Sequence, residues 1–371
     1  MKVLKFGGTS VGTTESLLKV REIVSSQEGR VVVVVSAMGG VTNALIKMTE
    51  LAIAKDSAYE ATLQEIRSRH AKVIAEVIPG DRKSECESFV MSLIDENLAS
   101  LLAMLCLNEI PADIEKNISK TILSFGETLS SAIVTMMLDA EPHYAPNFIK
   151  TNWSEGNDVL NAGLTNQLIA EEFGKSSADI IVTQGFIARD SKNERDTNLG
   201  RGGSDFTAAL IAAAINAESL EIWTDVDGFL TADPRIVPNA KLVERMTYSQ
   251  AESLCSGGAK VVYFPTITPV AEHHIPSWVK NTFNQFAKGT LISDEESTEE
   301  IVGVTSKDDT LTVVTKDSAD LAKIADVLMK GLIKNSIMAC PVSRTVNSVT
   351  MKVATDNMAL AVKTAHGLLI E

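Results

Sequence analysis

The chain contains 371 residues, of which 45% are hydrophobic and 22% charged, and its formal net charge is −14 at pH 7. This length predicts two to three domains, and the composition is typical of a globular protein. The negative charge disfavours a nucleic-acid partner. The sequence has no apolar run near the roughly 20 residues of a membrane helix and no secretion signal. Together with four isolated cysteines, which we expect to be reduced and buried, this indicates a cytoplasmic protein without a membrane segment.

The first 40 residues alternate between strand and helix signals. Residues 3–6 predict a strand that Gly7-Gly8 ends, and residues 14–24 have the apolar spacing of a helix. The five valines at 31–35 predict a strand buried on both faces of a parallel sheet, and Gly39-Gly40 follows it. This order is typical of a βαβ unit and predicts an α/β fold.

Helices and further strands are expected downstream. The sequence is helical from 41 to about 107, and Ser124 to Glu127 has the spacing of a capping box that would open a helix ending near Leu138. Strand patterns return at 147–150, 180–183, 220–224 and 278–281, with an Ala-rich helix at 204–216.

Residues 294–300 carry five acidic side chains and predict an exposed linker. Beyond it we expect a strand near 310–315, a helix at 319–332, strands near 337–341 and 349–353, and a helix at 358–369. This βαββα order is one strand short of a ferredoxin-like unit. We therefore expect one domain over 1–293 and a second, incomplete module over 301–371.

Glycine-bearing turns follow four of the predicted strands, at Gly7-Gly8, Gly39-Gly40, Gly185 and 200–203. Each alone is more often a plain chain reversal. In an open parallel sheet, however, ligands bind beyond the carboxyl ends of the strands, where bare backbone N–H groups can hold phosphate oxygens. Neither common nucleotide fingerprint, G-x-x-x-x-G-K-[ST] or G-x-G-x-x-G, occurs in the chain.

Four charged residues near these turns each allow two interpretations. Lys5 either extends from the end of its strand to water or directs its charge at a phosphoryl group. Asp205 either stabilises a helix start that Ser204 caps or takes part in chemistry. Glu127 has a structural explanation in the capping box. Arg201 is either a surface loop residue or, between glycines, a bidentate ligand for a carboxylate.

Several strings of the chain together resemble aspartokinases, in the amino-acid kinase superfamily. The match begins at Lys5-Phe6-Gly7-Gly8-Thr9-Ser10-Val11 and runs in register over roughly residues 1–292. The other matching strings are Ser36 to Asn43, Ser124 to Glu127, Gly200 to Asp205, Trp223 to Gly228, Asp233-Pro234-Arg235, Gly258 to Val261, and Lys280 to Ile292.

The resemblance implies a fold and an activity. It implies an open, mostly parallel sheet sandwiched by helices, followed by a ferredoxin-like module of the ACT type. The catalytic domain would divide into an aspartate-binding lobe, about 1–150, and an ATP-binding lobe, about 178–293. The implied reaction is transfer of the γ-phosphoryl group of Mg-ATP to the β-carboxylate of L-aspartate, the first step towards lysine, threonine and methionine. A homodimer and an end-product effector, lysine or threonine, are also implied.

The family's roles fall on matching positions of this chain. Lys5 and Asp205 would be catalytic, with Asp205 orienting the lysines around it. Arg201 would bind the α-carboxylate of aspartate and Glu127 its ammonium, while Ser36, Thr42 and Ser204 supply hydroxyls. The ATP site would comprise Lys5, Phe6, Gly7, Gly8, Thr224, Asp225, Leu230, Arg235, Lys260 and Val261. Mg²⁺ would be held by the ATP phosphates rather than by protein side chains.

Two alternatives stay open. One is another amino-acid kinase, acting on glutamate or N-acetylglutamate, although these lack the Ser124-to-Glu127 string. The other is a catalytically silent amino-acid sensor, against which the retained Lys5, Asp205, Arg201 and Glu127 argue. The chain also departs from the family at Tyr263-Phe264, where His-Pro is usual, and at Leu230, where tyrosine is common. These departures bear on nucleotide affinity rather than on a catalytic group.

Overall fold

The computed structural model describes residues 1–370 and divides into two compact units, Met1–Asp225 and Val226–Glu371. Strands of the first unit form a parallel sheet in which the N-terminal strand is an interior strand. Their order is β9 (Ser219–Thr224), β1 (Lys2–Phe6), β2 (Val31–Val35), β6 (Ile180–Gln184) and β3 (Glu141–His143). All five valines of β2 are buried, as predicted for a strand covered on both faces.

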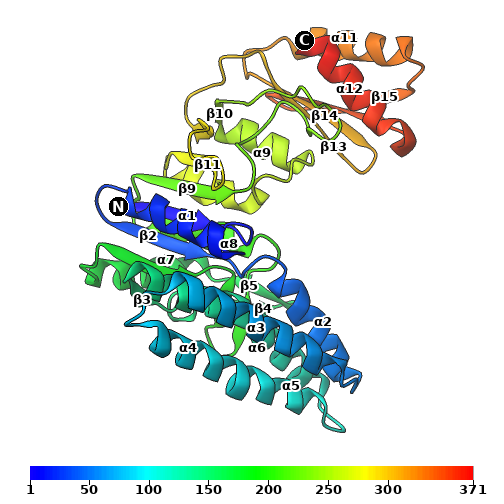
Figure 1. Ribbon diagram of the computed structural model, residues 1–371. Helices are drawn as coiled ribbons and strands as arrows, with labels where there is room; N and C mark the ends of the chain where they lie inside the picture. The colour runs from blue at the N-terminus through cyan, green and yellow to red at the C-terminus, as the bar shows by residue number, and fades with distance from the viewer. Residues whose placement is uncertain (371) are drawn as a thin grey trace. The chain divides into compact units, whose positions relative to one another are not determined.

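Helices cover both faces of this sheet. Leu4, Phe6 and alternate valines of β2 share one core with residues from the helices between β2 and β3 and from α1 (Thr14–Ser25). Figure 1 shows these helices gathered together in the first unit. They are α2 (Val41–Ile53), α3 (Ala58–Val77), α4 (Lys83–Ser92), a π-helical segment (Leu93–Leu98), α5 (Ala99–Leu105) and α6 (Ala112–Leu138).

The other face of the sheet is covered by α8 (Gly203–Ala214), which packs on β1, β2 and β9, and α7 (Ala162–Lys175) packs on α8. Because side chains alternate along a strand, Lys5 faces α8 while Leu4 and Phe6 face the larger core. A small separate sheet has the order β5 (Asn157–Leu160), β4 (Lys150–Ser154), β7 (Ile187–Asp190) and β8 (Asp196–Asn198).

Two helical segments of the first unit, Lys83–Leu105 and Ala112–Leu138, are long and apolar enough by length and composition to cross a membrane. This is weak evidence, because core helices pass the same test. The second segment, α6, is mostly buried and contributes Ile122, Leu129 and Val134 to the main core. Its apolar side chains are therefore used in packing.

The second unit contains two sheets. The first has β10 (Arg245–Thr247) beside β12 (Thr290–Ser293), which pairs with β11 (Ser277–Asn281). Helices α9 (Tyr248–Ser256) and α10 (Ile267–Glu272) lie between β10 and β11 in the sequence. The second sheet is antiparallel, in the order β13 (Ile301–Lys307), β14 (Thr310–Thr315), β16 (Ser348–Val353) and β15 (Ala339–Arg344). It packs with α11 (Leu321–Lys334) and α12 (Met358–Leu369) around one apolar core.

The predicted fold class, a mostly parallel α/β sheet followed by an antiparallel α+β module, is confirmed. Residues 294–300 contain no helix or strand and separate β12 from β13. The compact units divide at Asp225 instead, so the domain and lobe boundaries given above remain predictions. The fourth strand that the C-terminal prediction lacked is β13, which is the first strand of the module rather than the last.

Four local predictions were wrong. Ser124 to Glu127 does not open a helix, because α6 runs unbroken from Ala112 and the Ser124 hydroxyl donates to the carbonyl of Lys120. Ser204 does not cap α8, whose N-cap is Gly202 without a side-chain bond. The strand expected at 147–150 begins only at Lys150, after a 3₁₀ turn. Cys340, expected to be buried, is exposed.

Candidate active site

A pocket of about 380 Å³ in the first unit brings half of the predicted site residues together. All four glycine-bearing turns contribute to its construction, three through lining residues and Gly185 through its contact with α8. Eight predicted residues line the pocket: Lys5, Gly8, Ser36, Thr42, Glu127, Arg201, Ser204 and Asp205. These positions span two hundred residues of sequence, and the parallel sheet accounts for their meeting.

The turns meet because neighbouring parallel strands end at the same edge of the sheet. The N–H of Gly7 donates to the carbonyl of Trp223 at 3.1 Å, and the N–H of Ser36 donates to Phe6 at 3.1 Å. In the same way the N–H of Gly185 donates to Val35 at 2.9 Å. Each chain reversal is thus fixed to the end of the strand beside it.

Lys5 and Asp205, which line this pocket, form an ion pair. Lys5 Nζ lies 2.7 Å from Asp205 Oδ1, and the two side chains are only 10% and 14% exposed. Asp205 is in the first turn of α8, so the N-terminal end of that helix dipole also favours its negative charge. A Cβ at Gly7 would lie 3.4 Å from Lys5 Nζ, which places the ammonium directly against bare backbone.

Glu127 presents a buried carboxylate to the same pocket. It is 4% exposed, and its Oε2 atom has no hydrogen-bond partner among residues 1–370. Burial raises the pKa of Glu127 to about 7, although the backbone N–H of Ala37 and the charge of Lys5 act in the opposite direction. An unpaired acceptor in such a place is costly unless a ligand donates to it. The site therefore suits a ligand that carries a cationic or N–H group.

The pocket wall depends on two close approaches that exclude side chains. A Cβ at Gly8 would lie 2.9 Å from the Ala37 carbonyl oxygen, and the N–H of Gly39 donates to the Gly8 carbonyl at 2.8 Å. A Cβ at Gly185 would lie 2.4 Å from Cβ of Ser204, the second residue of α8. Only glycine permits these contacts, so the turns pack more closely than any side chain would allow.

Arg201 lies between Gly200 and Gly202, whose φ angles are +72° and +73°. Its side chain is exposed and makes no ion pair among the described residues. Arg201 lines the pocket, and its guanidinium is suited to bidentate binding of a carboxylate. The structure thus leaves the predicted carboxylate role open to this residue.

The remaining predicted nucleotide residues fall in two groups. In the first unit, Thr224 and Asp225 follow β9, and the Thr224 hydroxyl donates to the Asp225 carboxylate at 3.3 Å. In the second unit, Arg235 is 2.6 Å from Asp233, and this guanidinium lowers the pKa of the Asp233 carboxyl. The second-unit members of the set are Leu230, Arg235, Lys260 and Val261.

Sequence reasoning missed four residues that line the pocket, Ala37, Met38, Asn43 and Phe186. Ala37, Met38 and Asn43 belong to the matched string from Ser36, so their place in that string was an available signal. Phe186 directly follows Gly185 and has a φ of +67°, with its N–H bonded to the Thr207 hydroxyl at 3.1 Å. No sequence pattern predicts this left-handed conformation for a phenylalanine.

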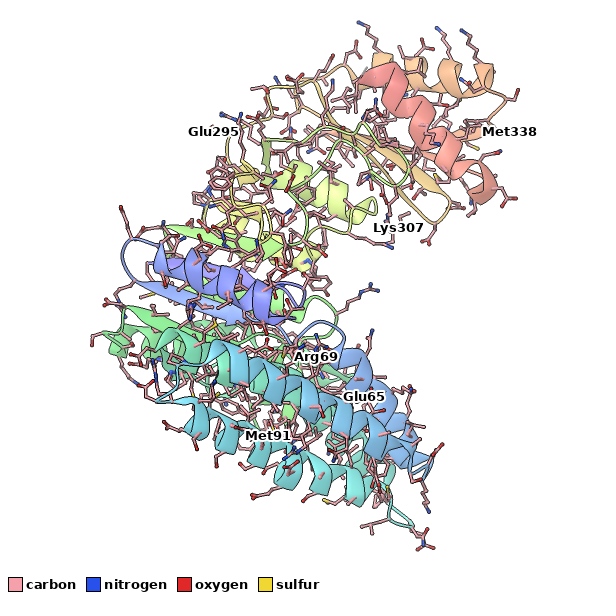
Figure 2. The ribbon with its side chains drawn as sticks, viewed as in Figure 1. Glu65, Arg69, Met91, Glu295, Lys307 and Met338 are labelled. Carbon is pink, nitrogen blue, oxygen red and sulfur yellow. The ribbon has the colours of Figure 1, made fainter. Side chains whose placement is uncertain are left out.

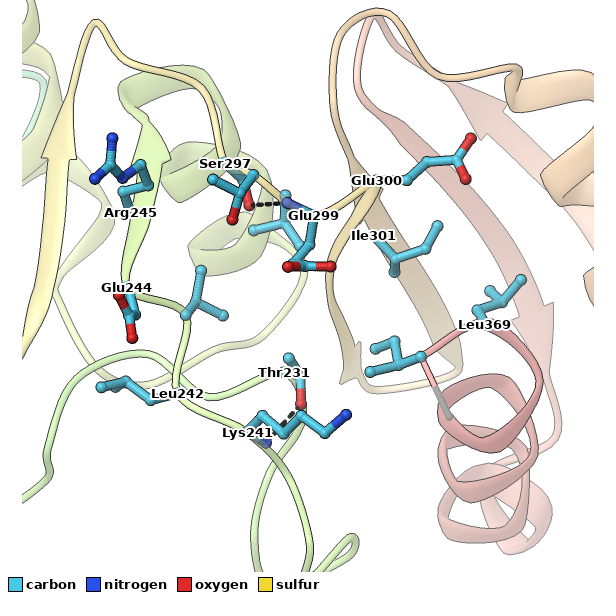
Figure 3. A pocket seen from close by; sticks show the side chains of 14 residues that line it. Thr231, Lys241, Leu242, Glu244, Arg245, Ser297, Glu299, Glu300, Ile301 and Leu369 are labelled. Atoms are coloured by element: carbon cyan, nitrogen blue, oxygen red, sulfur yellow. Dashed lines mark hydrogen bonds between the residues drawn. The ribbon is translucent and has the colours of Figure 1, made fainter.

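The second unit has a larger cavity, of about 500 Å³, that contains none of the predicted site residues. Figure 3 shows Glu299 and Lys241 among its lining side chains, with Leu369 on the side of α12. Its charged groups are exposed, whereas Lys5, Asp205 and Glu127 of the smaller pocket are largely buried. The smaller pocket is therefore the candidate active site.

The family model described as the amino acid kinase family matches residues 1–281. The chain belongs to the amino acid kinase family, as the sequence resemblance predicted. Its curated relatives include a bifunctional aspartokinase/homoserine dehydrogenase of Buchnera aphidicola, 33% identical over 83% of this chain and 39% of that protein. Lysine-sensitive aspartokinase 3 of Escherichia coli is 31% identical over 79% of this chain and 64% of that protein. The chain spans about a third of the length of the first bifunctional relatives.

Solved structures of aspartokinases share the fold. The complex of E. coli aspartokinase III with aspartate and ADP has a TM-score of 0.84 at 22% identity and covers 100% of both chains. The complex of the same enzyme with lysine and aspartate has a TM-score of 0.72 at 26% identity, covering 99% of this chain and 83% of that one. The first likeness establishes the fold, and the second has a slightly higher sequence identity over a smaller part of the solved chain.

Proposed function

We propose that this protein is an aspartokinase, which transfers the γ-phosphoryl group of Mg-ATP to the β-carboxylate of L-aspartate. The observation that carries the proposal is the meeting of the Lys5–Asp205 ion pair and the unpartnered Glu127 carboxylate in one pocket. Curated relatives named as aspartokinases support the substrate. The charges of the pocket match a ligand with an ammonium group and anionic ends.

The α-amino acid would be held by opposite charges at its two ends. Glu127 accepts from the substrate ammonium, which satisfies its otherwise unpartnered Oε2 atom. Arg201 binds the α-carboxylate, and hydroxyls of Ser36, Thr42 and Ser204 complete the contacts. The β-carboxylate then points towards Lys5. Because a carboxylate with a pKa near 3.9 is already ionised at neutral pH, the nucleophile needs no general base.

ATP would enter with its phosphates against Lys5 and the bare backbone of Phe6, Gly7 and Gly8. The ammonium beside Gly7 and the side-chain-free turn fit a polyphosphate, which needs cations and N–H donors at close range. Mg²⁺, held by the phosphates, neutralises charge on the transferring group when bound. Thr224, Asp225, Leu230, Arg235, Lys260 and Val261 are proposed as the other nucleotide contacts. Asp205 keeps Lys5 aimed at the transferring phosphoryl group.

The antiparallel sheet of the second unit supports a homodimer. Its edge strand β15 has exposed side chains along five of its six positions, including Val342. An unpaired edge of this kind is a template for a second copy of the chain. An end product such as lysine or threonine is the proposed effector, since one relative is named as lysine-sensitive. We expect the protein in the cytoplasm, with no nucleic-acid or membrane partner.

The activity is tested by coupled ADP release with Mg-ATP and L-aspartate, L-glutamate or N-acetyl-L-glutamate, with hydroxylamine trapping of the acyl phosphate. We expect turnover with aspartate and aspartyl hydroxamate as the trapped product. Turnover with glutamate or its acetyl derivative would reassign the substrate within the family. Binding of aspartate without turnover would instead support a sensor.

A further inference from the structure

Two loops of the pocket are joined by an arginine outside it. We define the β1 loop as residues 7–13 and the β2 loop as residues 36–40. Arg69, on α3, donates from Nη1 to the Gly39 carbonyl at 2.6 Å and from Nη2 to the Gly12 carbonyl at 2.7 Å. One guanidinium therefore spans one carbonyl from each loop. Figure 2 labels Arg69 and Glu65 on this helix.

Without Arg69 the two loops would be joined by few polar contacts. The Gly39 N–H donates to Gly8, and the glycines leave no side chains to interlock there. Gly40 adopts a left-handed φ of +85°, and a Cβ at this position would lie 3.8 Å from Arg69 Nη1. Such flexible backbone needs an external support to keep one geometry.

Arg69 is well placed to supply that support. Its neighbours on α3, Ile66, His70 and Val73, are at most 4% exposed, so the helix is fixed in the core. No carboxylate pairs with Arg69 anywhere in residues 1–370, so its charge-assisted bonds go to the two loop carbonyls. Arg69 is absent from the lining of the pocket, so it acts through the loops and not on a ligand.

We infer that Arg69 is a positioning residue that sets the spacing between the phosphate-binding β1 loop and the β2 loop that precedes Thr42. This inference rests on the proposed function, in which the β1 loop holds ATP and Ser36 and Thr42 hold aspartate. Reactive groups must be held within fractions of an ångström, and a 1 Å displacement can lower the rate about a hundredfold. The planar guanidinium can bridge both carbonyls, whereas a lysine ammonium is a single point of charge.

The test compares Arg69→Ala and Arg69→Lys with Arg67→Ala. Arg67 is a matched control, because it lies on the same helix and its guanidinium is bound to Asp95 on the surface at 2.9 Å. We expect kcat/KM of R69A to fall about a hundredfold, R69K to recover only part of the loss, and R67A to match wild type. Added guanidinium at low millimolar concentration should restore part of the activity of R69A.

Amide hydrogen exchange provides a readout that does not depend on turnover. In R69A, peptides covering residues 7–13 and 36–43 should exchange at least tenfold faster, while peptides of α6 and β6 match wild type. R67A should show no change in either loop. A merely structural arginine would instead lower the melting temperature and speed exchange across α3 and its core neighbours. If R69A does not fold, R69K serves for both measurements.

The outcomes separate the inference from the proposed function. The role of Arg69 is overturned if the wild type is active and kcat/KM of R69A lies within twofold of the wild-type value. It is also overturned if amide hydrogen exchange in the two loops is unchanged in R69A. Absence of wild-type turnover with aspartate overturns the proposed function alone, since loop-restricted exchange in R69A still supports Arg69 as the link between the loops.

Discussion

Lys5 Nζ lies 2.7 Å from Asp205 Oδ1, and both side chains are nearly buried. The pairing supplies an opposite charge to the Lys5 ammonium and directs it, in a place where an isolated charge would be costly. It also means that Lys5 is already aimed before a nucleotide arrives. Such a preorganised cation contributes most when charge develops on the transferring phosphoryl group.

Lys5→Ala should therefore lower kcat by at least a hundredfold while aspartate still binds. The loss falls on kcat because the ammonium acts mainly in the transition state. Steady-state kinetics, with aspartate binding followed by calorimetry, measure both quantities. Lys2→Ala is the matched control, since Lys2 begins the same strand and contacts Gln27 at 3.1 Å. A variant that keeps more than a tenth of wild-type kcat would contradict the role.

Arg201→Ala should raise the KM for aspartate by one to two orders of magnitude with a smaller effect on kcat, because a two-pronged carboxylate contact is lost. Initial rates over a range of aspartate concentrations give both constants. Arg82→Ala removes another arginine of the first unit, paired with Asp139 at its surface, and should leave KM unchanged. An unaltered KM in R201A would mean that a different group holds the α-carboxylate.

The pKa of Glu127, raised to about 7 by burial, predicts a pH-dependent KM. Above pH 7 the carboxylate is ionised and can accept from the substrate ammonium. Below pH 7 it is protonated, so the KM for aspartate should rise by up to tenfold per pH unit. The measurement is KM between pH 5.5 and 8.5, with Glu127→Gln as the comparison. A flat wild-type profile through pH 7 rules out Glu127 as the titrating group.

The same shift makes Glu127 a source of instability in the free protein. Its folded-state pKa lies above the ordinary glutamate value of 4.5, so the loss of folding stability builds as pH rises from 4.5 to about 7 and is complete above that. Glu127→Gln should thus stabilise the unliganded protein at pH 8 by up to roughly 3 kcal/mol, with little effect at pH 4.5. Urea unfolding at the two pH values measures this. Equal stability of the two proteins at pH 8 would count against the shift.

Gly185→Ala should damage both stability and activity. The added methyl would lie 2.4 Å from the Cβ of Ser204, so the start of α8 must move and carry Asp205 with it. We expect a loss of roughly 1–3 kcal/mol, as in other overpacked sites, and a drop in kcat. Gly174→Ala is the control, because an added Cβ meets nothing within 4 Å and α7 should gain stability. Thermal unfolding and kcat of both variants decide the point.

Features set by short stretches of sequence were predictable. The run of valines at β2 and the glycines after β1 and β2 specify local structure through burial and backbone freedom. The capping-box pattern at Ser124 misled because it is local, whereas α6 is held by a buried face along its whole length. Strand β13 was missed because it forms by pairing with β14 after an acidic stretch that has no strand signal.

The site itself was predictable only in part. The matched strings identified which residues belong together, but not that Glu127 would be left with an unpartnered oxygen or that Phe186 would take a left-handed backbone. Arg69 has no sequence signal at all. Its position in a helical run gives no sign that its guanidinium reaches two loops of the sheet edge. Such contacts depend on how whole helices pack, which local patterns do not encode.

The central place of β1 has a consequence for how the protein is made. Ser10 donates to the carbonyl of Trp223, 213 positions further along, and β1 needs β9 to cover its second edge. During synthesis β1 can therefore pair with β2 early, but it can pair with β9 only after nearly the whole first unit has left the ribosome. Contacts this distant in sequence form slowly. The return of enzymatic activity after dilution from denaturant should accordingly trail the recovery of helical signal.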